Sequence, residues 1–228
     1  MKNTFQNLTT TQELDEARNY YRNERIPAAA LKVMDAATEE LTESGVVEHA
    51  LKPGATAPDF ILPDAQGQPV RLFSLLEKGP VVLIFYRGGW CPYCNLHLRG
   101  FQRLLGEFRS AGAQLVAVSP QLPDHSLDTQ TKNALEFPVL SDVGLHTAHA
   151  FGIAFKLPRP LLDLYDAFGH PLADFNSEAG QTELPMPATF VIGRDGTIAF
   201  AHVEADYTRR AEPLEVLAQI KQLETATS

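Results

Sequence analysis

Two cysteines stand three positions apart in this 228-residue chain, and the chain has no others. Cys91 and Cys94 occur in the stretch YRGGWCPYCNLHLRGF, with a proline and a tyrosine between them. A close pair of thiols can alternate between a dithiol and a disulfide, or it can contribute ligands to a metal. In a reducing compartment such a pair is more often catalytic or metal-binding than structural.

The residues around the pair predict a buried strand followed by a helix. The apolar run at 81–87 is typical of a strand covered on both faces, and Pro92 suits the first turn of a helix over about 92–110. Cys91 is expected at the exposed start of this helix, where free N–H groups and the helix dipole would stabilise a thiolate. Cys94 is expected on the buried face, as the resolving thiol.

Two other interpretations of the pair stay open. Buried free cysteines can serve as small apolar residues, although that explains two of them after Gly-Gly-Trp poorly. A zinc site needs four ligands and the pair supplies half of them, so a metal or iron–sulfur cluster would have to be shared across a dimer. Elsewhere, Asp142, His146 and His149 share one helical face and could imitate metal ligands, but Asp142 is also a natural N-cap. We expect neither a bound metal nor a cofactor.

Charge and hydropathy exclude several classes of partner. The net charge of −9 and the pI near 5.2 argue against nucleic acid and against an anionic membrane. The longest apolar run, at 80–86, is far shorter than the ~20 residues of a membrane span. The first 21 residues lack the apolar core of a secretory signal, which predicts a cytoplasmic location.

The chain divides into an N-terminal helical extension, 1–50, and a main domain, 51–228. Helices are expected at about 10–24 and 27–44, as a small helical hairpin. Its apolar stripe should pack on the main domain or on a second copy of the chain in a homodimer. The Pro- and Gly-rich stretch at 51–58 marks the boundary.

Strand and helix signals alternate after this boundary. Strands are expected at 81–87, 114–120, 137–142 and in a hairpin at 188–203, with a short hairpin around PDAQGQ, and helices at 92–110, 124–134, 143–152, 159–169 and 212–224. The pattern predicts an α/β domain with parallel central strands and an antiparallel hairpin at one edge.

Four stretches, in order along the chain, carry a family resemblance: KPGATAPDFIL, FYRGGWCPYC, VAVSPQ and LPMPATFVIGRDGTI. From about Leu51 onward the chain resembles the peroxiredoxin-like proteins of the alkyl hydroperoxide reductase/thiol-specific antioxidant (AhpC/TSA) family. The resemblance implies a thioredoxin-like fold, with a central mixed sheet flanked by helices, and a thiol peroxidase. Cys91 would attack a hydroperoxide, Cys94 would close a disulfide, and thioredoxin or glutathione/glutaredoxin would reduce it.

The chain departs from the family pattern at three positions. Typical peroxiredoxins carry Thr or Ser three residues before the peroxidatic cysteine and Pro four residues further back; here these positions are Gly88 and Ile84. Where they carry Arg before a late strand, this chain has Pro187, as thioredoxin-like reductases do. A rival function is therefore a thiol–disulfide oxidoreductase acting on protein or glutathione disulfides. A third is a redox sensor or assembly module that binds a partner through residues 1–50.

Three side chains near the pair are candidates for supporting roles. Arg87 could stabilise the thiolate or bind the leaving oxygen of the peroxide, or it could be an ordinary surface arginine. Trp90 resembles the tryptophan before the thioredoxin pair and could shield the disulfide or dock a partner, or simply pack. His97 is expected to be a hydrogen-bonded histidine at the core edge rather than a proton shuttle.

Pro187 is expected to form a cis peptide bond and to pack against the cysteine pair. It directly precedes the strand ATFVI, where thioredoxin-like proteins place a cis-proline loop. A cis bond would turn the backbone of Met186 toward Cys91, so that its N–H and C=O could dock an extended substrate.

Overall fold

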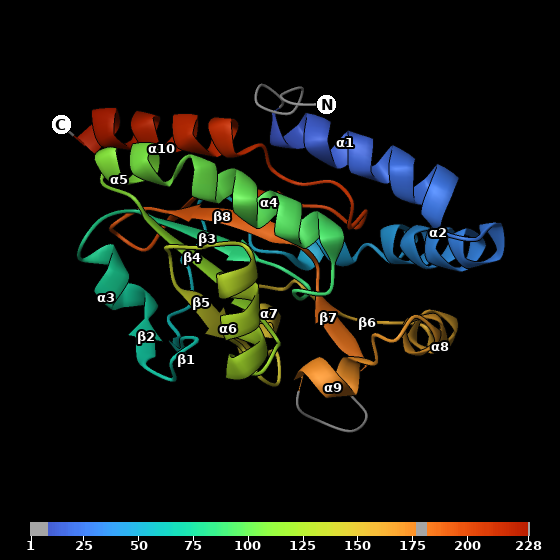
Figure 1. Cartoon of the computed structure of the whole chain (residues 1–228). Coiled ribbons are helices and arrows are strands. Elements are labelled where there is room, and N and C mark those ends of the chain that lie inside the picture. The colour runs from blue at the N-terminus through green and yellow to red at the C-terminus, as the bar shows by residue number, and fades with distance from the viewer. Residues whose placement is uncertain (1–8, 177–181, 228) are drawn as a thin grey trace.

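A five-stranded sheet forms the centre of the computed structural model, which describes residues 9–176 and 182–227 (Figure 1). In spatial order the strands are β5 (Val139–Ser141), β4 (Gln114–Ser119), β3 (Val81–Phe85), β8 (Ala188–Ile192) and β9 (Ile198–Val203). β3, β4 and β5 are parallel, and β8 and β9 pair antiparallel at the other edge. The predicted parallel centre with an edge hairpin is confirmed.

Both faces of the sheet are buried, because the side chains of β3 alternate between two apolar layers. Val82 and Ile84 face one layer, whereas Leu83 and Phe85 face the other. The first layer is covered by α4 (Pro92–Arg103), α5 (Leu105–Ser110) and α10 (Pro213–Thr227), which Figure 1 shows side by side along the sheet. The second layer includes α3 (Leu72–Leu76) and α7 (His146–Ala150), while α6 (Pro123–Lys132) packs beside β5.

The helix predicted over 92–110 is two helices rather than one. Leu104 leaves the helical conformation, with φ −100° and ψ 5°, and so separates α4 from α5. The predicted apolar face nevertheless continues through the break, since Phe101, Leu105 and Phe108 are all buried. The break keeps one apolar face on the sheet along both helices.

The N-terminal extension packs on the main domain at two separate places. Its elements are α1 (Thr10–Tyr20), the π-helical turn η1 (Tyr21–Arg25), α2 (Ala28–Glu43) and the 3₁₀ turn η2 (Val46–His49). The side chain of Thr9 caps α1 in a capping box with Gln12. α1 packs on α4, and α2 packs on α8 (Arg159–Ala167). The expected packing on the main domain is confirmed.

Two short antiparallel ribbons lie outside the central sheet. One, β1 (Ile61–Pro63) with β2 (Pro69–Arg71), is the short hairpin that the sequence predicts. The other, β6 (Ala154–Lys156) with β7 (Glu183–Pro185), was not expected, and neither was α9 (Leu172–Asn176). The β6–β7 ribbon matters for the site, because β7 leads directly into β8. None of the described helices has the length and apolarity needed to cross a bilayer.

Candidate active site

The cysteine pair is reduced and fully buried at the start of α4. Cys91 is the N-cap residue; its N–H donates to the carbonyl of Gly88 at 3.1 Å, and its carbonyl accepts the N–H of Asn95 at 3.2 Å. Both cysteines are free thiols with 1% exposure. The expectation that Cys91 is exposed is therefore wrong. Aromatic rings cover this helix start: Tyr93 packs on Tyr21 of the extension at 5.9 Å and on Tyr207 at 5.7 Å between ring centroids.

A tight loop of two glycines and a tryptophan joins β3 to the pair. Gly88 has a positive φ of 154°, and a Cβ built there would lie 2.3 Å from Nε1 of Trp90. Hydrogen bonds hold the loop: the N–H of Gly89 donates to Oε1 of Gln121, and Nδ2 of Asn95 donates to the carbonyl of Gly89, both at 2.8 Å. A threonine at position 88 would collide with the indole, so its absence follows from the position of Trp90.

Arg87 lies inside the protein rather than on its surface, with an exposed fraction of 3%. Its Nη2 donates to the hydroxyl of Tyr165, and its guanidinium lies 5.0 Å from the Trp90 ring and 4.5 Å from the Tyr207 ring. Nε has no partner in the described chain. Burial lowers the pKa of Arg87, but Tyr165 and the thiols of Cys91 and Cys94 outweigh it and keep the pKa above its ordinary value. Arg87 is therefore a permanent buried cation beside the pair.

A second buried arginine reaches the pair from the loop after β9. Arg210 is 8% exposed, and its Nη2 lies 3.6 Å from Sγ of Cys94. Its Nη1 donates to the carbonyls of Tyr207 and Arg209. The sequence reasoning missed this residue. Arg210 stands 116 positions after Cys94, and no motif around it points to a thiol.

The two thiols differ in their readiness to ionise. Burial raises the pKa of both. For Cys94, the hydrogen bond from the Cys91 thiol and the charges of Arg210 and Arg87, together with a main-chain hydrogen bond from Arg87, outweigh burial, so the pKa of Cys94 lies well below its ordinary value. For Cys91, the hydrogen bond to Cys94 and the negative charge there add to burial, so its pKa lies well above its ordinary value. The two pKa shifts run in opposite directions, which makes Cys94 the more acidic thiol of the pair.

The other titratable groups around the pair are neutral near pH 7. Burial raises the pKa of Tyr86 and Tyr93 to about 12, raises the pKa of Tyr165 and Tyr207, and lowers the pKa of His97 well below its ordinary value. His97 bonds through Nε2 to the carbonyl of Ala211 at 3.0 Å, which confirms the hydrogen-bonded interpretation of this histidine. Among the described residues, no carboxylate forms an ion pair with Arg87 or Arg210.

The expected cis bond at Pro187 is wrong, because the structure has no cis peptide bond in its described residues. The chain runs without a turn from β7, which pairs with β6, into β8, which pairs with β3. The N–H of Met186 donates to the carbonyl of Ile153 at 2.8 Å and is not available to a substrate. The Met186 side chain is fully buried in the second apolar layer. Pro187 itself is buried and lines a small cavity together with Arg87.

This small cavity lies between the extension and the thiol site. Its lining includes Met34 of α2, Leu161 and Tyr165 of α8, Arg87, Pro187 and Tyr207. Trp90 is half-buried nearby and packs on Tyr165, with 5.4 Å between ring centroids. The cavity is an apolar pocket with one cationic wall.

Two of the three residues that could imitate metal ligands, Asp142 and His149, have hydrogen-bond partners within the described chain. The carboxylate of Asp142 accepts the N–H groups of Thr147 at 3.0 Å and Ala148 at 2.9 Å in the first turn of α7, but the N-cap residue of this helix is Leu145, so the expected N-cap position of Asp142 is wrong. His149 bonds to Glu183 across to β7, with 3.0 Å between Nε2 and Oε2.

A mixed sheet whose central strand leads into a helix that starts with a buried Cys-Pro-Tyr-Cys pair defines a thioredoxin-like protein with a dithiol site. The sequence profile of the AhpC/TSA family matches residues 53–201, and the chain belongs to this family. The chain is 30% identical over 158 residues to a Mycobacterium tuberculosis protein whose name includes the word peroxiredoxin. The aligned residues cover 69% of this chain and 88% of that protein.

Two further relatives represent the two chemistries that the sequence leaves open. The structure is similar to that of peroxidoxin BcpB from Mycobacterium tuberculosis, with a TM-score of 0.59 and 26% identity, covering 75% of this chain and 97% of the other. The chain is also 31% identical over 110 residues to the thiol-disulfide oxidoreductase ResA of Halalkalibacterium halodurans, covering 48% of this chain and 61% of that one.

The family match does not include all of the site. Arg87, both cysteines and Pro187 lie within the matched residues 53–201. Arg210 follows them, and the extension that covers the helix start precedes them.

Proposed function

We propose that the protein is a thiol peroxidase that reduces hydroperoxides through Cys91 and Cys94. The observation that carries this proposal is a reduced dithiol in an AhpC/TSA chain, placed beside two buried arginines that have no carboxylate partner among the described residues. A buried guanidinium needs a compensating negative charge, and the thiolate supplies it. The same charges stabilise the oxygen that leaves when a peroxide is cleaved.

The proposed reaction has two steps within the protein. A thiolate attacks the terminal oxygen of the hydroperoxide; a sulfur–oxygen bond forms, the oxygen–oxygen bond breaks, and the leaving alkoxide takes up a proton and departs as an alcohol. The sulfur is then a sulfenic acid. The second thiol attacks this sulfur, a disulfide forms, and water leaves. An external dithiol returns two electrons and two protons.

Thioredoxin or the glutathione/glutaredoxin system is the proposed reductant. Because both thiols are buried, the cavity beside Arg87 is the proposed route by which the hydroperoxide reaches them. Trp90 forms part of the aromatic surface beside that route and packs against Arg87. Met186 plays no direct part in this proposal, since its N–H is already bonded.

Peroxide consumption in the presence of thioredoxin, thioredoxin reductase and NADPH tests this function. The wild type is expected to turn over, whereas Cys91→Ser and Cys94→Ser should each lose recycling. The same assay with glutathione and glutaredoxin identifies the reductant. A wild-type rate no higher than that of the double variant Cys91→Ser/Cys94→Ser would reject the peroxidase function.

A thiol–disulfide oxidoreductase is the second candidate, favoured by the likeness to ResA and by the Cys-Pro-Tyr-Cys pair itself. Reduction of insulin disulfides and of glutathione mixed disulfides measures this activity directly. If disulfide reduction is much faster than peroxide consumption by the same preparation, the second candidate replaces the first.

A further inference from the structure

No hydrogen bond within α4 holds a thiolate on Cys91. The helix begins at Pro92, which has no N–H to donate. Within the described residues, the Cys91 side chain makes no capping hydrogen bond to the first turn of α4. Burial does not distinguish the two sulfurs either, since both are 1% exposed. The capping hydrogen bond that a helix start can give to the first cysteine is therefore missing here.

Cys94, in contrast, has a direct cationic partner. Nη2 of Arg210 lies 3.6 Å from its Sγ, within reach of a hydrogen bond to sulfur. The remaining contacts of Arg210 are main-chain carbonyls, those of Tyr207 and Arg209, which orient the guanidinium without neutralising it. Of the two sulfurs, only that of Cys94 forms a hydrogen bond with a guanidinium group in the described part of the chain.

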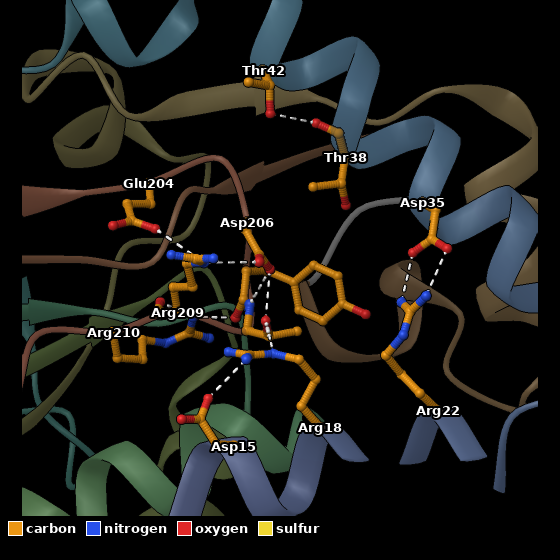
Figure 2. A network of polar contacts seen from close by, with 12 residues as sticks. Asp15, Arg18, Arg22, Asp35, Thr38, Thr42, Glu204, Asp206, Arg209 and Arg210 are labelled. Atoms are coloured by element: carbon orange, nitrogen blue, oxygen red, sulfur yellow. Dashed lines mark hydrogen bonds and ion pairs between the residues drawn. The ribbon is translucent and has the colours of Figure 1, made fainter. Parts of the chain in front are cut away.

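The loop that carries Arg210 is held by helix α1 of the extension. Nε of Arg18 donates to Oγ1 of Thr208 at 2.9 Å, and Thr208 in turn donates its N–H and its hydroxyl to Oδ1 of Asp206, at 2.9 and 2.7 Å. Figure 2 shows Arg18 reaching from α1 into this loop, next to Arg209 and Arg210. The loop is thereby fixed two residues before Arg210.

A second contact with α1 fixes the loop on the other side of Arg210. Both the N–H and the hydroxyl of Thr11 donate to Oε2 of Glu212 at 2.8 Å. α1 also lies close on α4: a Cβ on Gly100 would stand 2.3 Å from Oγ1 of Thr10. Helix α1 thus contacts both the helix that carries Cys94 and the loop that carries Arg210.

From these contacts, we propose that Cys94 rather than Cys91 is the attacking sulfur, that Arg210 fixes the negative charge on it, and that Arg18 is a positioning residue for Arg210. The attacking role of Cys94 rests on the proposed peroxidase function, whereas the location of the negative charge on Cys94 does not depend on that function. Cys94 would become the sulfenic acid, and the Cys91 thiol would then attack the Cys94 sulfur, with loss of water, to close the disulfide. The expected roles of the two cysteines are exchanged.

The pH titration of each thiol tests the location of the charge without any substrate. The reduced full-length protein is labelled at the cysteine Cβ with ¹³C, and the two signals are assigned with Cys91→Ser. We expect the Cys94 signal to stay in its thiolate position through neutral pH and the Cys91 signal to remain that of a thiol into the alkaline range. The charged groups facing the pair are Arg87 and Arg210, and the other titratable groups are Tyr86, Tyr93, Tyr165, Tyr207 and His97.

Variants of the two supporting arginines give the matched comparison. Arg210→Met should raise the titration midpoint of Cys94 by about one to two pH units, because a hydrogen bond to a charged group is worth roughly that. Arg210→Lys should bring the titration midpoint of Cys94 part of the way back from its value in Arg210→Met toward the wild-type value. A merely structural role of Arg210 would not predict this recovery. Arg18→Gln should move the midpoint in the same direction by a smaller amount. Arg22→Gln is the control, since Arg22 pairs with Asp35 and not with the loop.

Oxidation products test which sulfur attacks. After excess peroxide, Cys91→Ser should carry sulfinic acid on Cys94, and it should form faster than any sulfinic acid on Cys91 in Cys94→Ser. Faster oxidation of Cys91, a Cys91 signal that titrates first, or an unmoved midpoint in Arg210→Met would each overturn the inference. If the titrations come out as expected but the wild type consumes no peroxide, the peroxidase function fails and the placement of the charge stands.

Discussion

Arg87 and Arg210 approach the same buried pair, but the protein holds them in different ways. Arg87 follows the central strand and is surrounded by rings, with the Tyr165 hydroxyl as its hydrogen-bond acceptor. Arg210 belongs to a loop and is held by main-chain carbonyls and by the contacts of that loop with α1. Arg87 and Tyr165 lie within the family-matched residues 53–201, whereas Tyr207 belongs to the loop of Arg210, and Arg210 depends on segments at both ends of the chain.

The difference separates two properties of the site. Arg87 supplies positive charge to both thiols through a rigid setting that local packing maintains. In the proposed arrangement, the hydrogen bond from Arg210 to the Cys94 sulfur decides which thiol is ionised, while the charge of Arg210 lowers the pKa of both thiols. In the same proposal, the flanking segments that hold Arg210 make the pair asymmetric.

The largest effect is expected from removing Arg87. Arg87→Met should lower kcat/KM for a hydroperoxide by about 10- to 100-fold, because hydrogen bonds and ion contacts to a charged group contribute ~1.5–3 kcal/mol. Steady-state kinetics measure this, with Arg87→Lys as the charge-preserving control. A rate within twofold of the wild type would show that the ring-bound arginine is a packing element only.

A smaller effect is expected from removing the Tyr165 hydroxyl, which accepts a hydrogen bond from Arg87. Tyr165→Phe keeps the ring and the burial but removes the hydroxyl, so Nη2 of Arg87 loses its neutral acceptor. We expect the free energy of unfolding to fall by about 1–3 kcal/mol, since a buried donor is left without its partner. Urea denaturation of the reduced protein measures this. An unchanged midpoint and slope would mean that the rings alone hold Arg87.

The smallest effect is expected at the ion pair of Arg22 with Asp35, which joins η1 to α2 with both groups about half exposed (Figure 2). Arg22→Gln should change the free energy of unfolding by less than about 1 kcal/mol, because exposed pairs are screened by water. Thermal unfolding at two salt concentrations checks this. A loss much larger than this would show that the pair contributes more to the packing of η1 on α2 than an exposed ion pair usually does.

Local signals were enough to predict most of the fold. The apolar run before the pair, the proline at the first helical position and the Arg-Asp-Gly turn each place an element through its own residues, and the strands and helices that they predict are present. The break at Leu104 and the β6–β7 ribbon were missed, because tertiary packing and pairing with a distant segment decide them.

The site was predictable only as far as it is local. Eight consecutive positions contain Arg87, Cys91 and Cys94, so the sequence alone was enough to predict that these three residues lie close together. The burial of Cys91 could not be seen, because the rings that cover it come from positions 21 and 207 as well as from its own helix. The cis interpretation of Pro187 relied on resemblance, whereas its backbone is fixed by the pairing of β7 with β6.

The contacts between α1 and the loop of Arg210 also set an order of events during synthesis. Arg18 bonds to a residue 190 positions later, and Thr11 to one 201 positions later. A chain emerging from the ribosome therefore exposes both thiols long before the residues that distinguish them exist. Contacts of such long range close late, because the entropy of a large loop must be overcome first. Until then the nascent protein lacks the contacts that hold Arg210 beside Cys94, and these form only when the loop before the last helix has joined the first helix.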